Sequence, residues 1–594
     1  MKRLKLLFFF ASCVWGSCYA QSLQQPNYQQ YLANSINLSG ISLLGEQPYF
    51  GIGKKQVLEN IPSFLSSGAL VNYAPALRKS SSFGVVYPAL HLIRQQRGFR
   101  SKMKINGSQF GEWDANVHLA SDFRHVDNNF VAHFAQNSAR MDRNDDNFLD
   151  LPLSKRLFLM ERTRIKDGDL ELNIGTYFLK KEEQNGHLNF DTDDRAYAFG
   201  NDMQHLGTSV QAGMDLANHY EKRHRLLAQV DGVLHERRDY YGDSQYIGNQ
   251  KDFHGLFGYI FEVSKIPQFF IGAKFDYTNL KERFAQLEQV RRERSIGLLA
   301  RHQSHWSKWL LTETNLELER HNLQKTNIRP SLRLNILFPE EKEFYLNFFS
   351  AYDWRYPNLF TDYTRIFVSD YKLQIDQRDL DNWQPNKLWQ FGLAASYKTS
   401  YYNEIKLQYH YFNFRQKTLW DLYQTPNEID IYTSQERAFR HLLEVRWKQR
   451  LVEQLNLGVT YRYDQSKSTY QGELRLDPFL SLHTIYSTLS YNKNLFYTSL
   501  RYHLHSPQQI IGWKNSQSPW LHRLDFKAHY RLYYAMRKEA FKPFSFTFGI
   551  DNLLANQQPI IFQEDANGFN GMNLWGIAHG TRFHLGVGYD LRIN

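Results

Sequence analysis

The 594-residue chain is almost free of cysteine and has no long apolar run after its first twenty residues. Its two cysteines, Cys13 and Cys18, both lie in that first stretch, so the rest of the chain offers no disulfide and no thiolate metal site. No later stretch approaches the roughly 18 apolar residues that a membrane-spanning helix requires. With a mean hydropathy of −0.57, the chain is not a helical membrane protein.

The first twenty residues predict a secretory signal. Three cations among the first five residues precede the apolar stretch Leu6–Trp15, and small residues follow near Ala20, so we expect cleavage before Gln21. An alternative is lipidation at Cys18, although Trp15 is an unfavourable residue three positions before it. Removing the three leader cations lowers the formal net charge from +11 to 11 − 3 = +8.

Aromatic residues and strict alternation are abundant. Aromatic side chains make up 15% of the chain, and the last fourteen residues, Thr581–Asn594, alternate between two faces. The apolar face carries Phe583, Leu585, Val587, Tyr589, Leu591 and Ile593. The polar face carries Arg582, His584, Gly586, Gly588, Asp590 and Arg592. This period of two indicates a β-strand between two environments, either the two faces of a soluble sheet or lipid and a wet barrel lumen.

The same alternation of apolar and polar residues recurs along most of the chain, and the connections between these segments are alternately short and long. Leu524, Phe526, Ala528, Tyr530 and Leu532, for example, oppose Arg523, Asp525, Lys527, His529 and Arg531. Tight polar connections, such as Lys166–Asp169, alternate with long ones, such as Lys180–Gly207, Arg237–Asp252 and Tyr356–Lys387. Outer-membrane barrels show this asymmetry. We therefore predict an all-β chain forming a transmembrane antiparallel barrel of about 22 strands; a large soluble multidomain β-protein is the alternative.

Five segments resemble one family of such barrels. Phe546–Pro559 and Gly580–Leu591 are similar to the closing hairpin of TonB-dependent outer-membrane receptors, including the Gly-x-Arg that opens the last strand. Trp354–Tyr363 and Asn382–Tyr397 resemble a long loop and return strand of the family, and Gly84–Ile93 sits where its first wall strand follows the plug. The resemblance implies a 22-stranded barrel with an internal plug that imports a bulky ligand with energy from the inner membrane.

The chain departs from the family pattern at its N-terminal side. We expect a signal over residues 1–20, a shortened plug over 21–83 and the barrel over 84–594, with Arg94–Gly107 in a wall hairpin. No clear energy-coupling box is visible; INLSGISLL, residues 36–44, is a degenerate candidate or a plain buried strand. Since so short a plug leaves lumen unfilled, loops such as Tyr356–Lys387 should fold inward to complete the seal.

These features predict an outer-membrane transporter for an unidentified solute. The alternatives are a porin-like passive channel and a surface binding or structural barrel that does not transport. The expected partners are outer-membrane lipid, the barrel-assembly machinery, TonB and a surface lipoprotein. Nucleic acid is not expected, because the cations are spread along the walls and not gathered in a patch. The chain lacks G-x-S-x-G, H-E-x-x-H and a phosphate-cradling glycine loop, so we expect neither an enzyme nor a cofactor.

Three sets of residues are candidate sites. The Tyr356–Lys387 loop mixes aromatic and basic side chains suited to flat or anionic ligands, although its aromatic residues are as readily explained by packing over the barrel mouth. Its candidate contacts are Tyr356, Tyr363, Arg365, Phe367, Arg378 and Trp383. Inward cations should attract an anionic solute, or else pair with inward Glu444, Asp464 and Asp525 or with the plug. The candidate lumen cations are Lys406, Arg446, Lys448, Arg462, Arg501, Lys527 and Arg531.

Aspartates form the third set, in two long loops. They are weak candidates for calcium ligands, since carboxylates are the oxygen donors that calcium prefers but neither run matches a defined calcium loop. Solvated loop charge is the simpler interpretation. The residues are Asp142, Asp145 and Asp146 in one loop and Asp191, Asp193 and Asp194 in the next.

Overall fold

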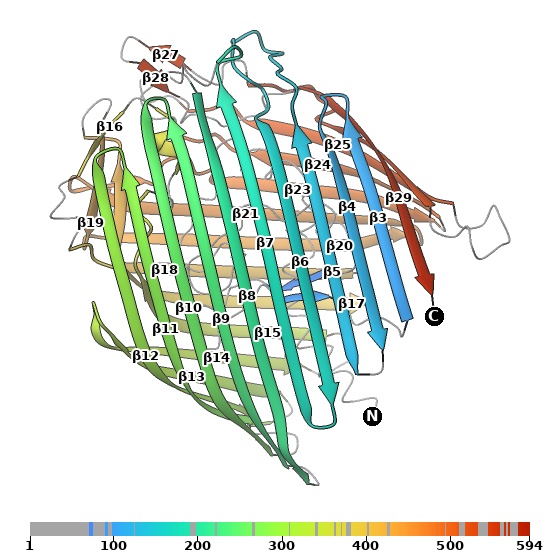
Figure 1. Cartoon of the computed structure of the whole chain (residues 1–594), viewed down its shortest axis with the longest axis vertical. Helices are drawn as coiled ribbons and strands as arrows, with labels where there is room; N and C mark the ends of the chain where they lie inside the picture. Colours follow the sequence, from blue (N-terminus) through green and yellow to red (C-terminus); the bar gives the residue numbers. More distant parts are fainter. Residues whose placement is uncertain are drawn as a thin grey trace.

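The chain forms a closed, all-antiparallel barrel of 22 wall strands (Figure 1). The computed structural model describes residues 71–74, 89–92, 98–123, 125–190, 198–219, 222–263, 268–307, 309–338, 343–360, 364–369, 371–375, 380, 382–400, 403–424, 428–493, 495–509, 517–532, 544–558, 563–565, 568–570 and 580–593. Within these ranges no helix is long and apolar enough to cross a membrane. The signal, the coupling-box candidate and nearly all of the expected plug lie outside them.

The wall strands follow one another in chain order. They are β3 Gly98–Ser108, β4 Trp113–Phe123, β5 Val126–Asn137, β6 Leu153–Asp167, β7 Leu170–Gly186, β8 Ala198–His219, β9 Lys222–Tyr241, β10 Ser244–Val263, β11 Gln268–Phe284, β12 Leu287–His305, β13 Leu310–His321, β14 Lys325–Phe338, β15 Glu343–Arg355, β17 Asn386–Ser400, β18 Asn403–Asp421, β20 Ala438–Val452, β21 Leu455–Tyr470, β23 His483–Lys493, β24 Phe496–His505, β25 Leu521–Arg531, β26 Phe544–Asp551 and β29 Arg582–Ile593. The last strand closes the barrel by pairing with the first, so the red β29 lies beside the blue β3 in Figure 1.

Shorter elements lie between the wall strands or before them. They are β1 Val71–Ala74, β2 Ala89–Leu92, the 3-10 helix η2 Thr364–Phe367, β16 Lys372–Gln374, β19 Glu428–Ser434, β22 Glu473–Leu476, β27 Gln563–Asp565 and β28 Gly568–Asn570. Strand β16 pairs in parallel with β19, which connects two loops at one end of the barrel.

Apolar side chains cover the outside of the wall and charged ones its inside. On β12, Ile296 and Leu298 are each 61% exposed, whereas on β13 the inward Glu317 and Glu319 are fully buried. A soluble protein of this size would bury the aliphatic residues and expose the carboxylates. The reversed arrangement is the one required of strands that face lipid on one side and a polar lumen on the other. The alternation predicted for Thr581–Asn594 is confirmed where side chains are described, with Phe583, Leu585 and Val587 exposed.

The two ends of the barrel differ. At one end, here the turn end, consecutive strands are joined by two to four residues, except at 532–543. At the other, the loop end, connections 138–152, 187–197, 356–385, 422–437, 471–482, 506–520 and 552–581 are long. The hairpin predicted at Lys166–Asp169 is confirmed: β6 ends at Asp167, β7 begins at Leu170, and Gly168 has φ +53°.

Two sequence-based boundaries were wrong. Gly84–Ile93 is not the first wall strand, because its Ala89–Leu92 part pairs with Val71–Ala74 in a separate two-stranded sheet, and the wall begins at Gly98. Arg237–Asp252 is not a long connection, since β9 continues to Tyr241 and β10 starts at Ser244. The prediction ended these strands where their apolar residues end. The strands themselves continue past that point with polar residues on both faces.

Candidate functional site

A packed apolar cap lies across the loop end of the barrel. We call it the cap cluster; it consists of Phe148, Phe199, Tyr241, Tyr246, Phe284, Leu359, Phe360, Ile366, Phe367, Val368, Leu380, Trp383, Trp420, Leu422, Ile429, Ile431 and Phe479. Phe284 stacks on Phe360 with ring centroids 5.6 Å apart, and Phe367 lies 4.7 Å from Phe284. Side chains from several loops and strand ends thus share one buried core, which holds those loops together.

The 356–385 loop supplies much of this core and is bonded to the inner wall. The Arg291 guanidinium donates to the carbonyl of Pro357 at 2.7 Å and to the Asn358 side chain at 2.9 Å. Trp420 Nε1 donates to the carbonyl of Leu359 at 3.2 Å. Because Arg291 and Trp420 are buried side chains at the ends of wall strands, these bonds draw the loop inward across the lumen.

The predicted ligand contacts of this loop lie within that packing or beyond the described residues. Tyr356, Phe367 and Trp383 are buried, and Trp383 Nε1 donates to Thr418 Oγ1 at 3.1 Å. Burial raises the pKa of the Tyr356 phenol. Tyr363, Arg378 and the side chain of Arg365 fall outside the part of the chain that is described. In this conformation Phe367 and Trp383 pack in the cap cluster and Tyr356 packs against His321 and Trp354, all three away from solvent, so ligand contact by this loop stays a prediction.

Most inward cations are neutralised by carboxylates on the same or the next strand. Arg446 pairs with Glu444, Lys406 Nζ lies 2.9 Å from Glu404, and Asp464 accepts from both Arg440 and Arg462. Lys448 also has a polar or charged neighbour, while Arg531 is exposed and its Nε lies 3.5 Å from His529. Five of the seven predicted lumen cations are therefore engaged with neighbouring groups, which leaves Arg501 and Lys527.

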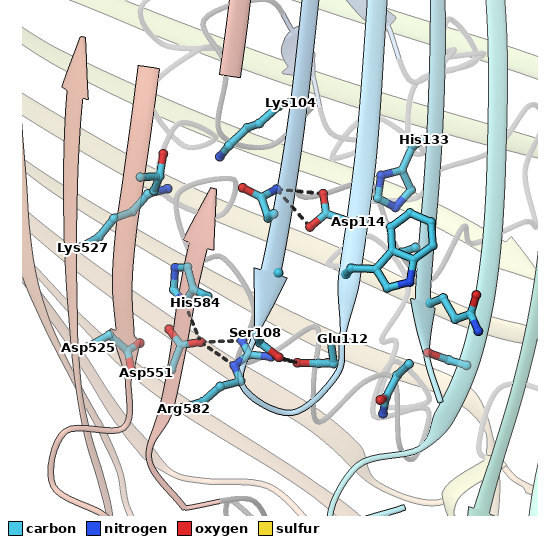
Figure 2. A pocket seen from close by; sticks show the side chains of 18 of the residues that line it. Lys104, Ser108, Glu112, Asp114, His133, Asp525, Lys527, Asp551, Arg582 and His584 are labelled. Carbon is cyan, nitrogen blue, oxygen red and sulfur yellow. Dashed lines mark hydrogen bonds and ion pairs between the residues drawn. The ribbon is translucent and has the colours of Figure 1, made fainter. Parts of the chain in front are cut away.

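These two cations line a polar pocket on the lumen wall. The pocket has a volume of about 180 Å³ and lies between β3–β6 and β24–β29, where the barrel closes (Figure 2). Its charged lining consists of Lys104, Arg156, Arg501, Lys527 and Arg582 against Glu112, Asp114, Asp525 and Asp551. The five positive charges and four negative charges nearly cancel, so the electrostatic potential in the pocket depends on which of these groups pair with one another.

Arg582 is the hub of the pairing in the pocket. Its Nη1 lies 2.7 Å from Glu112 Oε2, and its guanidinium also contacts the Asp551 carboxylate. Asp551 is shared with Arg523, whose Nε donates to Asp525 at 2.6 Å. Burial raises the pKa of Glu112, and the nearby Arg582 opposes that rise. Three of the four carboxylates are thus held by arginines, and Figure 2 shows Arg582 between Glu112 and Asp551.

The fourth carboxylate, Asp114, is held mainly by amides. Asn106 Nδ2 donates to both of its oxygens, at 2.8 and 3.0 Å, and Asn116 donates to it as well. The charge of Asp114 also acts on Lys104. On the other side of the pocket, Arg156 lies 3.9 Å from Glu183. No carboxylate in the pocket is therefore left to form a close pair with a further cation.

Of the cations that line the pocket, three form no hydrogen bond or ion pair with any residue in the described part of the chain. They are Lys104 on β3, Arg501 on β24 and Lys527 on β25. The charges of Lys104 and Arg501 both act on Lys527, which places the three close enough to repel one another. In Figure 2 the side chains of Lys104 and Lys527 point toward one another, and no dashed line reaches either. An anion between them would relieve that repulsion.

Glycines on the intervening strands open the space that these cations share. Lys527 is registered opposite Gly549 on β26, and Lys104 opposite Gly588 on β29. The His584 ring lies over Gly549, where an added Cβ would come 2.0 Å from its Nε2. Because Gly549 and Gly588 add no side chains to the floor between the lysines, which His584 and Thr547 line, both lysines can reach into the pocket.

The predicted calcium ligands bind their own loop. Asp142 accepts from the backbone N–H of Asn147 at 2.8 Å and Asp146 from that of Phe148 at 3.0 Å, while Asp145 has φ +56°. Across the described ranges no three His, Cys, Asp or Glu side chains are grouped to hold a metal ion. Asp191, Asp193 and Asp194 fall outside those ranges.

Alternation alone placed Arg501 and Lys527 in the lumen but did not find the rest of the pocket. Lys104 belongs to Arg94–Gly107, which was predicted as a wall hairpin, but the residues of that segment that face the lumen were not identified. Glu112 lies in a turn where no periodicity applies. Two features of the sequence could have pointed to the pocket: the polar face of the last strand, which carries Arg582, and the glycines Gly586 and Gly588 on that same face.

Comparison with known proteins finds similarity at the level of structure. No protein-family model matches the sequence, and no curated protein does. The siderophore receptor PirA from Pseudomonas aeruginosa aligns with a TM-score of 0.57 at 12% identity, covering 84% of this chain and 82% of that one. The copper transporter OprC aligns with a TM-score of 0.65 at 11% identity, covering 84% and 81%. A mutant of the ferric enterobactin receptor PfeA from Pseudomonas aeruginosa, in complex with enterobactin, aligns with a TM-score of 0.61 at 12% identity, covering 84% of this chain and 82% of that one.

At these identities the similarity establishes the architecture. These proteins are receptors and a transporter, and the alignments to the 22-stranded barrel cover more than four-fifths of each chain. The resemblance of the sequence to TonB-dependent outer-membrane receptors is therefore confirmed for the fold: this protein is a barrel of the outer-membrane receptor architecture.

Proposed function

We propose that the chain is an outer-membrane receptor that takes up an anionic solute through the barrel lumen. The observation that carries the proposal is the group Lys104, Arg501 and Lys527, which line one pocket without a close carboxylate partner. Unneutralised cations on a lumen wall concentrate anions, and the low dielectric of the surrounding protein strengthens their field. The pocket lies toward the loop end, and in membrane barrels long loops face outside. A solute entering from outside would therefore meet it early.

The cap cluster supports a gated uptake system more than a passive pore. An aromatic core that joins several loops would obstruct free diffusion through the loop end, so a ligand would have to displace it. The family resemblance supplies a source of energy for such a step, through coupling to TonB, and this partner belongs to the proposal as well. Secretion by a cleaved signal, a plug formed by residues 21–83, insertion by the barrel-assembly machinery and a surface lipoprotein partner likewise remain proposals.

Binding of citrate, a small polyanion, to the purified full chain tests the pocket. The pocket variant combines Lys104→Gln, Arg501→Gln and Lys527→Gln. A matched control combines Lys155→Gln, Lys372→Gln and Arg437→Gln, which removes the same charge from exposed positions outside the pocket. We expect the wild type and the control to bind citrate with an affinity that falls as salt rises, and the pocket variant to lose binding. Equal binding by all three proteins would refute the assignment.

A further inference from the structure

Outward-facing cations gather on four adjacent strands, directly above the lipid-facing surface. We call them the outer basic patch: Lys251 on β10, Lys281 on β11, Arg292 and Arg294 on β12, and Arg320 on β13. All five are exposed and belong to the outward alternation of their strands. Cross-strand register places them together, because Asn279 lies opposite both Lys251 and Arg292, and Arg320 lies opposite Ile296.

The outward residues of β10, β12 and β13 change from apolar to basic toward the loop end. On β12 the exposed Ile296 and Leu298 are followed by Arg294 and Arg292, and on β13 the exposed Leu318 is followed by Arg320. A lipid-facing band must end where the headgroups begin. The patch therefore lies at headgroup height, on the side of the barrel that faces outside if the loop end does.

These cations are not neutralised by the protein. No ion pair or side-chain hydrogen bond engages any of the five in the described ranges. The outward carboxylates nearest to them, Glu236 and Glu288, lie opposite Asn249 and Arg283 in the register and not opposite a patch residue. Five like charges within four strands repel one another, so the arrangement is stabilised when anionic groups are present.

The patch is also held in place. The Asn322 side chain accepts from the backbone N–H of Arg294 at 2.8 Å and donates to the carbonyl of Arg292 at 2.8 Å. These two bonds join β12 to the connection between β13 and β14. The Arg294 guanidinium lies 5.8 Å from the centroid of the Tyr277 ring. A fixed backbone and a guanidinium rested on an aromatic ring reduce the entropy lost when an anion binds.

Other strands present a different chemistry at their outward loop-end positions. There, pairs of tyrosine and histidine bond to one another: Tyr409 with His441 at 2.8 Å, Tyr461 with His483 at 2.9 Å and Tyr502 with His522 at 2.7 Å. Such amphipathic rings suit any membrane interface. The contrast shows that β10–β13 gather several cations in one sector, whereas exposed cations elsewhere, such as Lys155 on β6 and Arg415 on β18, lie apart from one another in the chain.

We propose that the outer basic patch binds the phosphate groups of a phosphorylated glycolipid in the outer leaflet. Arginine and lysine donate charge-assisted hydrogen bonds to phosphate oxygens, and the apolar surface directly beneath the patch accommodates the acyl chains of the same molecule. The inference rests on the proposed placement in the outer membrane but not on solute uptake, so its failure would leave the lumen pocket untouched.

Binding of lipid A to the full chain in neutral detergent tests the inference. Two probes are compared, bisphosphorylated lipid A and the same lipid with its phosphates removed. The patch variant combines Lys281→Gln, Arg292→Gln and Arg294→Gln, and the control is again Lys155→Gln, Lys372→Gln and Arg437→Gln. Since each Lys or Arg near an anionic membrane surface contributes about fivefold, we expect the patch variant to bind bisphosphorylated lipid A about a hundredfold more weakly, with the control unchanged.

Three outcomes would overturn the proposal. One is equal affinity of the wild type for the two lipids, because the phosphates would then contribute nothing. Another is wild-type affinity in the patch variant. The third is competition by inorganic phosphate as strong as that by the lipid, which would assign the patch to a soluble anion. Heat-modifiable migration in gels confirms that each variant is folded, and these exposed substitutions should leave it unchanged.

Discussion

Replacement of Arg582 by methionine should destabilise the seam where the barrel closes. Arg582 lies on the last wall strand and bridges Asp551 on the strand before it to Glu112 in the turn after the first. Its contact with Glu112 is therefore made across the closing junction, and its contact with Asp551 ties the last strand to the strand before it. Methionine fills a similar volume but leaves both carboxylates without this partner, and Arg582 itself is only 4% exposed.

The expected loss follows from these contacts. Removing one member of a buried ion pair typically costs about 3–5 kcal/mol, because the remaining charge is left uncompensated. Here Asp551 keeps a second cation, with Arg523 Nη2 at 3.6 Å, and Glu112 keeps a hydrogen bond from Ser108. We therefore expect a decrease near the lower limit, about 3 kcal/mol in the free energy of unfolding.

Urea unfolding of the detergent-solubilised barrel, followed by tryptophan fluorescence, measures this decrease. Burial raises the pKa of Glu112, and without Arg582 nothing nearby of comparable strength opposes that rise. A group with a raised folded-state pKa stabilises the fold at low pH and loses that contribution as pH rises through the raised value. The Arg582→Met defect should therefore be smaller at pH 5 than at pH 8, and Glu112→Gln in the same background should remove this difference.

The matched control is Lys155→Met, at an exposed position, which should change stability by no more than about 0.5 kcal/mol. A loss of similar size in both variants would mean that the seam is not held by the Arg582 contacts. A defect in Arg582→Met that does not change between pH 5 and pH 8 would refute the role given to Glu112.

Three further predictions concern the wall, the cap and a loop. Ile271→Arg, on the lipid-facing surface, should cost about 2–4 kcal/mol of unfolding free energy, whereas Gln245→Arg, near the loop end, should cost about 0–1 kcal/mol; equal losses would contradict the assigned band. Phe360→Ala removes a buried ring of the cap cluster, so hydrogen exchange of the 356–385 amides should accelerate by about a hundredfold, since such a truncation costs roughly 3 kcal/mol or more; unchanged exchange would mean that the cap is held by other contacts. Burial, aided by Asp142 and Asp146, raises the pKa of Asp150 to about 8, so the 138–152 loop should lose exchange protection as pH rises from about 4 to about 8, and Asp150→Asn should abolish that dependence.

The barrel was predictable because lipid imposes a repeating constraint on every wall strand. Each strand must present apolar residues outward and polar ones inward, so the alternation of Thr581–Asn594 recurs and can be read without knowing any partner strand. The same rule failed wherever no lipid is present. Strands β8–β12 continue above the membrane with polar residues on both faces, which is why Arg237–Asp252 was taken for a connection.

The candidate site was less predictable because it depends on pairing across the seam. Inward Lys527 and inward Arg523 have the same sequence signature, yet Arg523 is neutralised by Asp525 while Lys527 faces Lys104, more than four hundred positions earlier in the chain. The closing register between β29 and β3 brings Lys104 to the side of the pocket that faces Lys527. The cap cluster has the same origin, since its aromatic residues come from loops whose contacts no local pattern encodes.

The central claim is that unneutralised cations in the lumen select an anionic solute for uptake, and solute profiling tests it directly. Cells producing the wild-type chain, the Lys104, Arg501 and Lys527 variant, or the exposed-charge control are incubated with one complex nutrient extract, and the accumulated solutes are identified by mass spectrometry. We expect the wild type and the control to accumulate the same solutes, and those lost from the pocket variant to carry net negative charge. Identical profiles for all three strains, or selective loss of neutral or cationic solutes, would contradict the account.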